Sequence, residues 1–466
     1  MNAAIDSTIS VKELEVFFGD IQLLGPLSFS LGASETLIIM GETGAGKSLV
    51  AQAILGTLPK ELHFTGEVEI NGRQVQSLST RERAALWGHE IAALPQEPWL
   101  ALDPLMHSQK QVIVTHRHVA GRSLVVAKKA AEKDFSKLGL VGAEKYLPSK
   151  LSGGMAQRVA FAAATAGDAP ILLADEPTKG LDHKRVGKLV ELLKSVPKEG
   201  GTLIAITHDI ATAKQFEAKI LVLKNGKVVE SGIAQDVLNA PQSGYTSSLL
   251  DSSPVNWKKQ KKLQIGVRLL KASDVSIERG GKTLIQGFDL EIYQGERVAI
   301  TGPSGVGKTS LLDVFAGLLK PKGGVVEHSH VLRRNSIQKL YQDPPTAFPP
   351  FVLLETALKD VVNLCQASWD DILENMDKLM LDKTLLKRHP NQVSGGELQR
   401  ISIVRALITK PQILLCDEPT SRLDPITQHE TLDMLAKISS EKNIGLVLVT
   451  HDEMIARKWA HRNISL

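Results

Sequence analysis

The chain has 466 residues, of which 43% are hydrophobic and 23% charged, as is typical of a soluble globular protein with two or three domains. Its formal charge of +4 is too small to indicate a basic nucleic-acid-binding face, so we expect no nucleic-acid partner. Two cysteines, Cys365 and Cys416, cannot form a disulfide framework in a chain of this length, which favours a reducing, cytoplasmic compartment.

The N-terminal residues lack a basic stretch followed by an apolar one, so we expect no signal peptide. The apolar runs are the size of strands, well short of the roughly 18 residues that span a bilayer. Any role at a membrane would therefore depend on partner subunits.

The first chemical motif lies between a predicted strand, 36–40, and a predicted helix, 48–55. A strand, a glycine-rich loop and a helix in this order are the context of a phosphate-binding loop. Lys47 would neutralise the β- and γ-phosphates of ATP, and the Ser48 hydroxyl would bind Mg²⁺. Backbone N–H groups of the loop would bind the phosphates, here from Gly41, Gly44, Ala45 and Gly46.

A carboxylate pair, Asp175 and Glu176, ends the apolar run 171–174. The strand end projects Asp175 toward Mg²⁺, while the adjacent Glu176 can polarise the attacking water. His208 follows a later apolar strand, and we expect it to bind the γ-phosphate and to hold the water and the glutamate in place. Gln96 gains interest only because it recurs at a matching point of the second half.

The stretch 241–264 contains Pro, Ser and Gly, then Trp257 and four lysines. A polar, basic stretch without apolar periodicity is typical of a linker. The alternative, that the lysines bind nucleic acid or anionic lipid, is weaker because so short a run is common.

The second half repeats these motifs in the same order, after a predicted strand at 297–301 and with a predicted helix at 309–319. This is the signature of a duplicated domain, with copies at 1–240 and 265–466. The first copy is longer between Lys47 and Gln96, and we expect its extra residues between 56 and 93. The repeated residues are Gly302, Gly305, Val306, Gly307, Lys308, Thr309, Gln342, Asp417, Glu418 and His451.

A further repeated segment is Ser152-Gly153-Gly154, which returns as Ser394-Gly395-Gly396. With the motifs above, it makes nearly the whole chain resemble the ATP-binding cassette family, whose signature motif is this Ser-Gly-Gly. The resemblance implies an α/β fold of two tandem P-loop NTPase domains. Each would have a RecA-like core, an antiparallel β-subdomain and an α-helical signature subdomain.

In this family each ATP lies between the phosphate loop of one cassette and the signature of the other, so the resemblance implies two composite sites. One joins Lys47, Gln96, Asp175, Glu176 and His208 with Ser394, Gly395 and Gly396. The other joins Lys308, Gln342, Asp417, Glu418 and His451 with Ser152, Gly153 and Gly154. The implied Mg²⁺ ligands are Ser48, Gln96, Asp175, Thr309, Gln342 and Asp417.

Two further features follow from the same resemblance. Asp182 and Asp424 match the loop that contacts the opposite cassette. Phe18 matches the aromatic residue that stacks on adenine, whereas the corresponding position of the second copy is Arg279. We therefore expect unequal sites, with less selective base binding at the second.

The glutamine loops 96–104 and 342–350 and the extension 241–254 resemble the dipeptide, oligopeptide and nickel importer ATPases. This implies the ATPase motor of an importer of peptides, nickel or a metal chelate, peripheral on the cytoplasmic face of the inner membrane. Its partners would be two membrane permease subunits and an extracytoplasmic binding protein. The second copy is expected to lack the closing strand and extension, an end left incomplete or covered by a partner.

The alternatives are soluble tandem-cassette proteins: a ribosome-acting translation factor, a DNA-repair ATPase, or an accessory ATPase of phosphonate breakdown. A short linker broken by Pro254 disfavours the first, and two isolated cysteines cannot build the zinc modules of the second.

Overall fold

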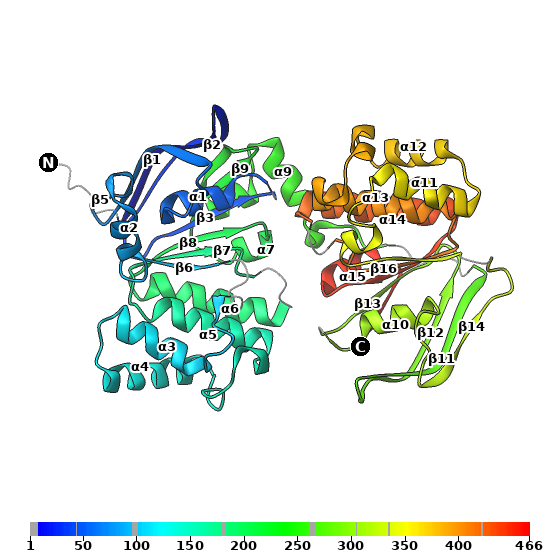
Figure 1. Cartoon of the computed structure of the whole chain (residues 1–466), viewed down its shortest axis with the longest axis horizontal. Helices are drawn as coiled ribbons and strands as arrows, with labels where there is room; N and C mark the ends of the chain where they lie inside the picture. The colour runs from blue at the N-terminus through cyan, green and yellow to red at the C-terminus, as the bar shows by residue number, and fades with distance from the viewer. Residues whose placement is uncertain are drawn as a thin grey trace. The chain divides into compact units, whose positions relative to one another are not determined.

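The computed structural model describes residues 8–42, 44–95, 101–178, 183–260, 266–303, 305–333, 336–420 and 423–466. The chain forms two compact units, Met1–Leu250 and Asp251–Leu466, each with its own mixed α/β architecture. Figure 1 labels the elements of both units.

The core of the first unit is a six-stranded sheet in the order β10-β9-β3-β8-β7-β6, parallel except for β10. All residues of β3 and β8 are buried, as expected for central parallel strands covered on both faces. Burying each large aliphatic side chain contributes about 1.5–3 kcal/mol. The strands are β3 (Thr36–Gly41), β6 (Ile91–Leu94), β7 (Ile171–Asp175), β8 (Thr202–Thr207), β9 (Lys219–Lys224) and β10 (Lys227–Ile233).

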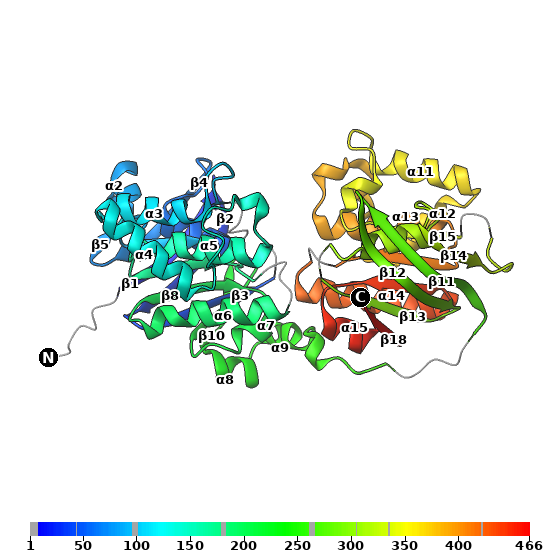
Figure 2. The same cartoon turned by 90° about the horizontal axis from the view of Figure 1, so that it is seen from below.

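A smaller antiparallel sheet and a group of helices flank this core on opposite sides (Figure 1). The sheet has the order β2-β1-β4-β5, with β1 (Ile9–Phe18), β2 (Ile21–Leu31), β4 (Leu62–Ile70) and β5 (Arg73–Gln74). The helices of the unit are α1 (Lys47–Leu55), α2 (Thr80–Leu86), α3 (Ser108–His118), α4 (Leu124–Lys137), α5 (Gly153–Thr165), α6 (His183–Lys198) and α7 (Ile210–Ala213). Of these, α3, α4 and α5 lie opposite the antiparallel sheet, whereas α1 and α2 lie on its side (Figure 1). Two more, α8 (Ala234–Asn239) and α9 (Gly244–Asp251), follow β10, and α8 packs on β9 and β10 (Figure 2).

The second unit repeats this plan. Its core sheet has the order β15-β16-β17-β13-β18 and its antiparallel sheet the order β12-β11-β14. The strands are β11 (Arg268–Arg279), β12 (Lys282–Tyr293), β13 (Arg297–Thr301), β14 (Gly323–His328), β15 (Ile337–Leu340), β16 (Ile413–Asp417), β17 (Gly445–Val449) and β18 (Arg462–Ser465). The helices are α10 (Lys308–Phe315), α11 (Leu354–Cys365), α12 (Trp369–Lys378), α13 (Gly395–Ile408), α14 (Pro425–Lys442) and α15 (Glu453–Trp459).

The two copies differ where the sequence predicts. Between α1 and β6 the first unit contains β4, β5 and α2, whereas the described part of the second contains β14 alone between α10 and β15. One boundary differs from prediction: α10 ends at Phe315 rather than Leu319, because Gly317 adopts a left-handed φ of 72°.

The stretch expected as a linker is partly folded. Residues 244–251 form α9, and the division between the compact units falls between Leu250 and Asp251. Trp257 is 8% exposed in the second unit, where it stacks on His429 with ring centroids 4.7 Å apart. Its backbone carbonyl also accepts a hydrogen bond from Lys458 at 3.0 Å. Among the described residues, no helix combines the length and the apolar character that crossing a membrane requires.

Candidate functional site

The phosphate loop of the first unit links β3 to α1. Gly46 caps α1 with a left-handed φ of 94°, a backbone conformation that favours glycine, and a Cβ there would also displace the end of the Leu24 side chain, 2.9 Å away. The Lys47 ammonium is buried and donates hydrogen bonds to the carbonyls of Gly41 and Glu42, each at 2.8 Å. It also lies 3.6 Å from the Glu176 carboxylate.

The second phosphate loop has the same design. Gly307 caps α10 with a φ of 110°, and Lys308 donates to the carbonyls of Gly302 at 2.8 Å and Pro303 at 3.0 Å. Burial lowers the pKa of Lys308, and the charges of Glu418 and Asp417 oppose that shift. Both loops therefore hold a buried ammonium at the N-terminal end of a helix, where anions bind.

The carboxylate pairs lie at the ends of β7 and β16, beside the phosphate loops. Glu176 and Glu418 both adopt a φ of 45°. Such a positive φ is uncommon for residues other than glycine, and residues with strained backbone cluster at functional sites. Their backbone N–H groups donate to Ile206 at 2.9 Å and Val449 at 3.0 Å, which fixes this turn. The sharp turn separates the direction of each glutamate from that of the aspartate before it.

A histidine contacts each glutamate. His208 Nδ1 lies 3.1 Å from Glu176, and His451 Nδ1 lies 3.4 Å from Glu418. Gln342 donates to Glu418 at 3.1 Å. The structure thus brings the predicted glutamine, glutamate and histidine of the second unit together.

Electrostatics keep Glu418 ionised. Burial alone would raise its pKa, but the hydrogen bond from His451 and the charges of His451 and Lys308 together lower it. The same hydrogen bond is the main cause of a raised pKa for His451. Burial, opposed by Lys339 and Thr309, raises the pKa of Asp417.

The Ser-Gly-Gly segments open α5 and α13. Ser152 and Ser394 are exposed N-cap residues that accept hydrogen bonds from Met155 N at 3.4 Å and Glu397 N at 3.3 Å. In the second unit the Ser394 N–H donates a hydrogen bond to the Glu397 carboxylate at 2.8 Å, which completes a capping box. Both helices therefore begin at a serine that is exposed at the surface.

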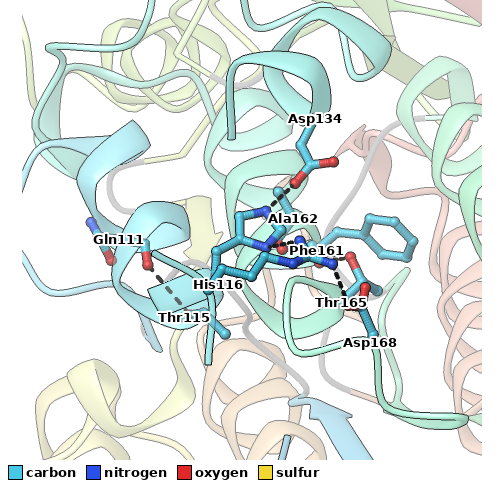
Figure 3. Close-up of polar contacts among 9 residues, drawn as sticks. Gln111, Thr115, His116, Asp134, Phe161, Ala162, Thr165 and Asp168 are labelled. Carbon is cyan, nitrogen blue, oxygen red and sulfur yellow. Dashed lines mark hydrogen bonds and ion pairs between the residues drawn. The ribbon is translucent and has the colours of Figure 1, made fainter. Parts of the chain in front are cut away.

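A polar network centred on the buried His116 connects the helices around α5 (Figure 3). His116 of α3 contacts Asp134 of α4 at 2.8 Å through Nε2. Its Nδ1 lies 2.6 Å from Arg122, which also pairs with Asp168 just beyond α5. Because a guanidinium can only donate, Nδ1 must accept, and the proton is assigned to Nε2. The network joins the helix that carries Ser152 to its two neighbours.

Other predicted residues have clear positions. Phe18 ends β1 opposite Ile21, and Arg279 ends β11 opposite Lys282, so the two occupy matching places and both are exposed. Asp424 caps α14 by accepting from Ile426 and Thr427. Gln96 and Asp182 lie outside the described residues.

Comparison with known proteins decides the family. The model of the "ABC transporter" family matches residues 24–179 and 285–421, once in each unit. The chain belongs to the ABC transporter family. It is accordingly an ATP-binding protein and an ATPase with two fused cassettes.

Relatives match this ABC ATPase along nearly its whole length. The "Peptidoglycan transport ATP-binding protein YejF" of Agrobacterium fabrum is 28% identical, with 97% of this chain and 90% of that protein covered. The "Glutathione import ATP-binding protein GsiA" of Escherichia coli is 26% identical, with 98% and 84% covered.

Among solved structures, an "RNase-L Inhibitor" has a TM-score of 0.64 at 20% identity, covering 93% of this chain and 84% of its own. A structure that contains "archaeal ribosome recycling factor aABCE1" has a TM-score of 0.66 at 19% identity, covering 100% and 88%. At these identities the likeness shows the fold alone.

Sequence reasoning missed two residues of the cassettes. The Tyr245 hydroxyl accepts a hydrogen bond at 2.9 Å from Glu42 N in the first phosphate loop, although Tyr245 had been noticed only as part of an extension. Lys339 of β15 lies 3.4 Å from Asp417. Aligning the two copies at Gln96 and Gln342 would have revealed a lysine where the first has Ala93.

Proposed function

We propose that this chain is the ATP-hydrolysing motor of an importer for peptide-containing substrates. The observation that carries the proposal is the repeated group of a buried lysine, a strand-end carboxylate pair and a histidine bonded to the glutamate. The relatives' names, peptidoglycan transport and glutathione import, support a peptide class over nickel or a metal chelate.

The residues divide the chemistry of hydrolysis. Lys47 and Lys308 bind the β- and γ-phosphates. Glu176 and Glu418 orient the attacking water and take up its proton, as the lowered pKa of Glu418 allows. His208 and His451 hold the glutamates and contact the γ-phosphate, which leaves as inorganic phosphate while ADP remains.

The second cassette has donors that fit Mg²⁺. The Thr309 hydroxyl donates to Asp417 at 3.2 Å, so two oxygen groups already lie together beside the phosphate loop. Oxygen ligands from one or two carboxylates plus substrate phosphates are the usual Mg²⁺ set. Ser48 and Asp175 would serve in the first cassette, with Gln96 and Gln342 as further ligands. When bound, Mg²⁺ neutralises charge on the β- and γ-phosphates.

We further propose that the cassettes pair head to tail. Phosphates bound by Lys47 would face the exposed N-terminal end of α13, and those bound by Lys308 would face that of α5. Helix N-termini suit this role because their first N–H groups point toward an anion and the helix dipole favours negative charge. Phe18 stacks on adenine at the first site, and Arg279 takes this place at the second.

Each cassette also offers a surface for one membrane subunit. In the second cassette a pocket of about 250 Å³ lies between the glutamine loop and α13, with Gln342, Pro345 and Leu398 among its lining residues. Leu105 and Phe351 occupy matching positions after Gln96 and Gln342 and are 88% and 89% exposed. We propose that these two apolar side chains bind two permeases at the cytoplasmic face of the membrane. An extracytoplasmic binding protein would deliver the substrate.

The catalytic assignment is tested with Glu176→Gln and Glu418→Gln combined. Loss of a general base lowers turnover by about 10²–10⁴-fold, so ATP binding should persist while hydrolysis stops. The matched control is Glu199→Gln with Glu374→Gln, one exposed glutamate in each cassette. Wild-type hydrolysis in the test variant would refute the role of the glutamates.

The importer assignment is tested by co-expression with any pair of membrane permease subunits found to be encoded beside the chain. We expect them to co-purify and to stimulate the ATPase, and Leu105→Asp with Phe351→Asp to abolish both effects while leaving basal hydrolysis. Co-sedimentation with ribosomes, without binding to membrane subunits, would overturn the importer in favour of a translation factor.

A further inference from the structure

A buried lysine lies beneath the carboxylate of Asp417 in the second cassette. The Lys339 ammonium is 3.4 Å from Asp417 and 2.7 Å from Asp313 of α10, and its side chain is 5% exposed. The ammonium also lies 5.4 Å from the centre of the Tyr341 ring. Lysine is rarely buried unless it is paired, and here two carboxylates and an aromatic face surround it.

Lys339 and Thr309 hold different oxygens of the same carboxylate. Thr309 donates to Oδ1 at 3.2 Å, and the Lys339 ammonium lies near Oδ2. Asp417 is therefore fixed from two sides. Its side chain is 5% exposed, so water does little to screen the ammonium.

The first cassette has other residues at the positions that match Lys339, Asp313 and Tyr341. Lys339 pairs with Leu415 in the sheet just as Ala93 pairs with Leu173, which establishes Ala93 as its counterpart. The counterpart of Asp313, counted from the phosphate-loop lysine, is Gln52. Pro95 stands where the second cassette has Tyr341. The second cassette thus has both the ammonium and its counter-ion, and the first has neither. The net charge at these two positions is therefore zero in both copies.

Although Lys339 and Asp313 together carry no net charge, they still affect the Asp417 carboxylate electrostatically, because the Lys339 ammonium is the member of the pair that contacts it. A cation so placed reduces the repulsion between Asp417 and the phosphates of ATP. At the matching position the first cassette has Ala93, which carries no charge, so this contribution to relief of the repulsion is specific to the second cassette. An opposite charge within about 4–6 Å changes the affinity of a carboxylate for a proton by roughly 10- to 1000-fold. We expect an effect of the same sign on its affinity for a metal cation, because both are positively charged.

We propose that Lys339, balanced by Asp313, is a positioning residue that holds Asp417 and makes ATP binding at the second cassette less dependent on Mg²⁺ than at the first. The inference rests on the proposed Mg²⁺ role of Asp417 and Asp175. The second cassette would thus retain ATP at Mg²⁺ concentrations that release it from the first.

The test measures binding of a fluorescent ATP analogue to the full chain with and without Mg²⁺. Lys47→Ala isolates the second site and Lys308→Ala isolates the first. We expect the ratio of the Kd without Mg²⁺ to the Kd with Mg²⁺ to be about tenfold smaller at the second site, the low end of the charge effect. Copying the first cassette with Lys339→Ala and Asp313→Gln should raise that ratio to the value of the first site.

The reciprocal exchange, Ala93→Lys with Gln52→Asp, should lower the ratio at the first site, and it tests the inference even if the other exchange unfolds the second cassette. Lys378→Ala, which removes an exposed lysine of α12, is the matched control and should change neither ratio. Equal ratios above one at both sites, unmoved by folded exchange variants, would overturn the inference and leave the Mg²⁺ role intact. A ratio of one at the first site would instead overturn the Mg²⁺ role itself.

Discussion

Removal of Lys339 alone should strongly destabilise the second unit. The ammonium is 2.7 Å from Asp313 and 3.4 Å from Asp417, so Lys339→Met removes a cation that contacts both carboxylates, of which Asp417 is 5% and Asp313 is 23% exposed. Breaking a buried ion pair by removing one partner costs about 3–5 kcal/mol. For a unit of this size, each kcal/mol shifts the melting temperature by about 2–4 °C, so the expected loss is roughly 6–20 °C.

The charge-neutral exchange separates this effect from simple packing. Lys339→Met with Asp313→Gln removes both charges and keeps most of the volume of the lysine stem, and replacing a whole buried pair by neutral residues is often nearly neutral. We therefore expect the double variant to recover most of the loss. Lys219→Met in the first unit is the control, because its pair with Glu35 is over 40% exposed on both sides and contributes at most about 1 kcal/mol.

Calorimetry of the full chain without nucleotide is the assay, and the double-mutant cycle gives the coupling free energy. The reasoning is refuted if Lys339→Met melts within about 1 °C of the wild type. It is equally refuted if the double variant loses as much as the single one, since the loss would then come from packing of the lysine stem and not from its charge.

Two further predictions concern single side chains. Tyr245→Phe removes the hydrogen bond from Glu42 N, worth about 1 kcal/mol, and should raise the Kd for ATP at the Lys47 site about fivefold in a binding titration, with Tyr146→Phe as control. His451 has a raised pKa in the folded protein because of its hydrogen bond to Glu418. Its stabilisation is therefore complete below about pH 6.5 and is lost as the pH rises through the raised value. His451→Gln should lower the melting temperature more at about pH 6 than at about pH 9; an equal loss at both would contradict this.

The sequence predicts those parts of the fold that carry a repeated chemical signal. The phosphate loops, strand-end carboxylates and Ser-Gly-Gly segments each define a strand or helix terminus, so β3, β7, α5 and their counterparts begin or end within a residue or so of the motifs. The strand before a phosphate loop is recognisable because it is buried on both faces and reads as a continuous apolar run.

Contacts that cross between distant segments could not be predicted in the same way. Trp257 stands next to a run of lysines, which favours a solvated linker, yet its indole is covered by His429 and its N–H donates to Ser252 at 3.0 Å. Tyr245 reaches a loop some two hundred positions earlier in the chain. In both cases tertiary packing overrides the local composition, and a single sequence contains no record of it.

The burial of Lys339 could not be predicted from the sequence for a different reason. A lysine in a short strand indicates an exposed position by its type, and only the positions of Asp313 and Asp417 in space make burial tolerable. Arg279 had suggested that the cassettes differ at the adenine, at the exposed edge of the site. The contacts of Lys339 reveal a second difference, at the carboxylate of Asp417.

The two differences are not equivalent in their consequences. Arg279 is exposed at a strand end, so its exchange changes a contact that solvent screens. The ion pair under Asp417 is largely buried, and its two members are tied to each other by charge. Gln52→Asp alone would add a carboxylate near Asp175, and Ala93→Lys alone would add an uncompensated ammonium. Each single step therefore changes the charge beneath the phosphates by one unit, whereas the paired exchange leaves it constant. The cassettes can differ in how they hold the carboxylate only if both residues change, and this coupling is what the paired variants measure.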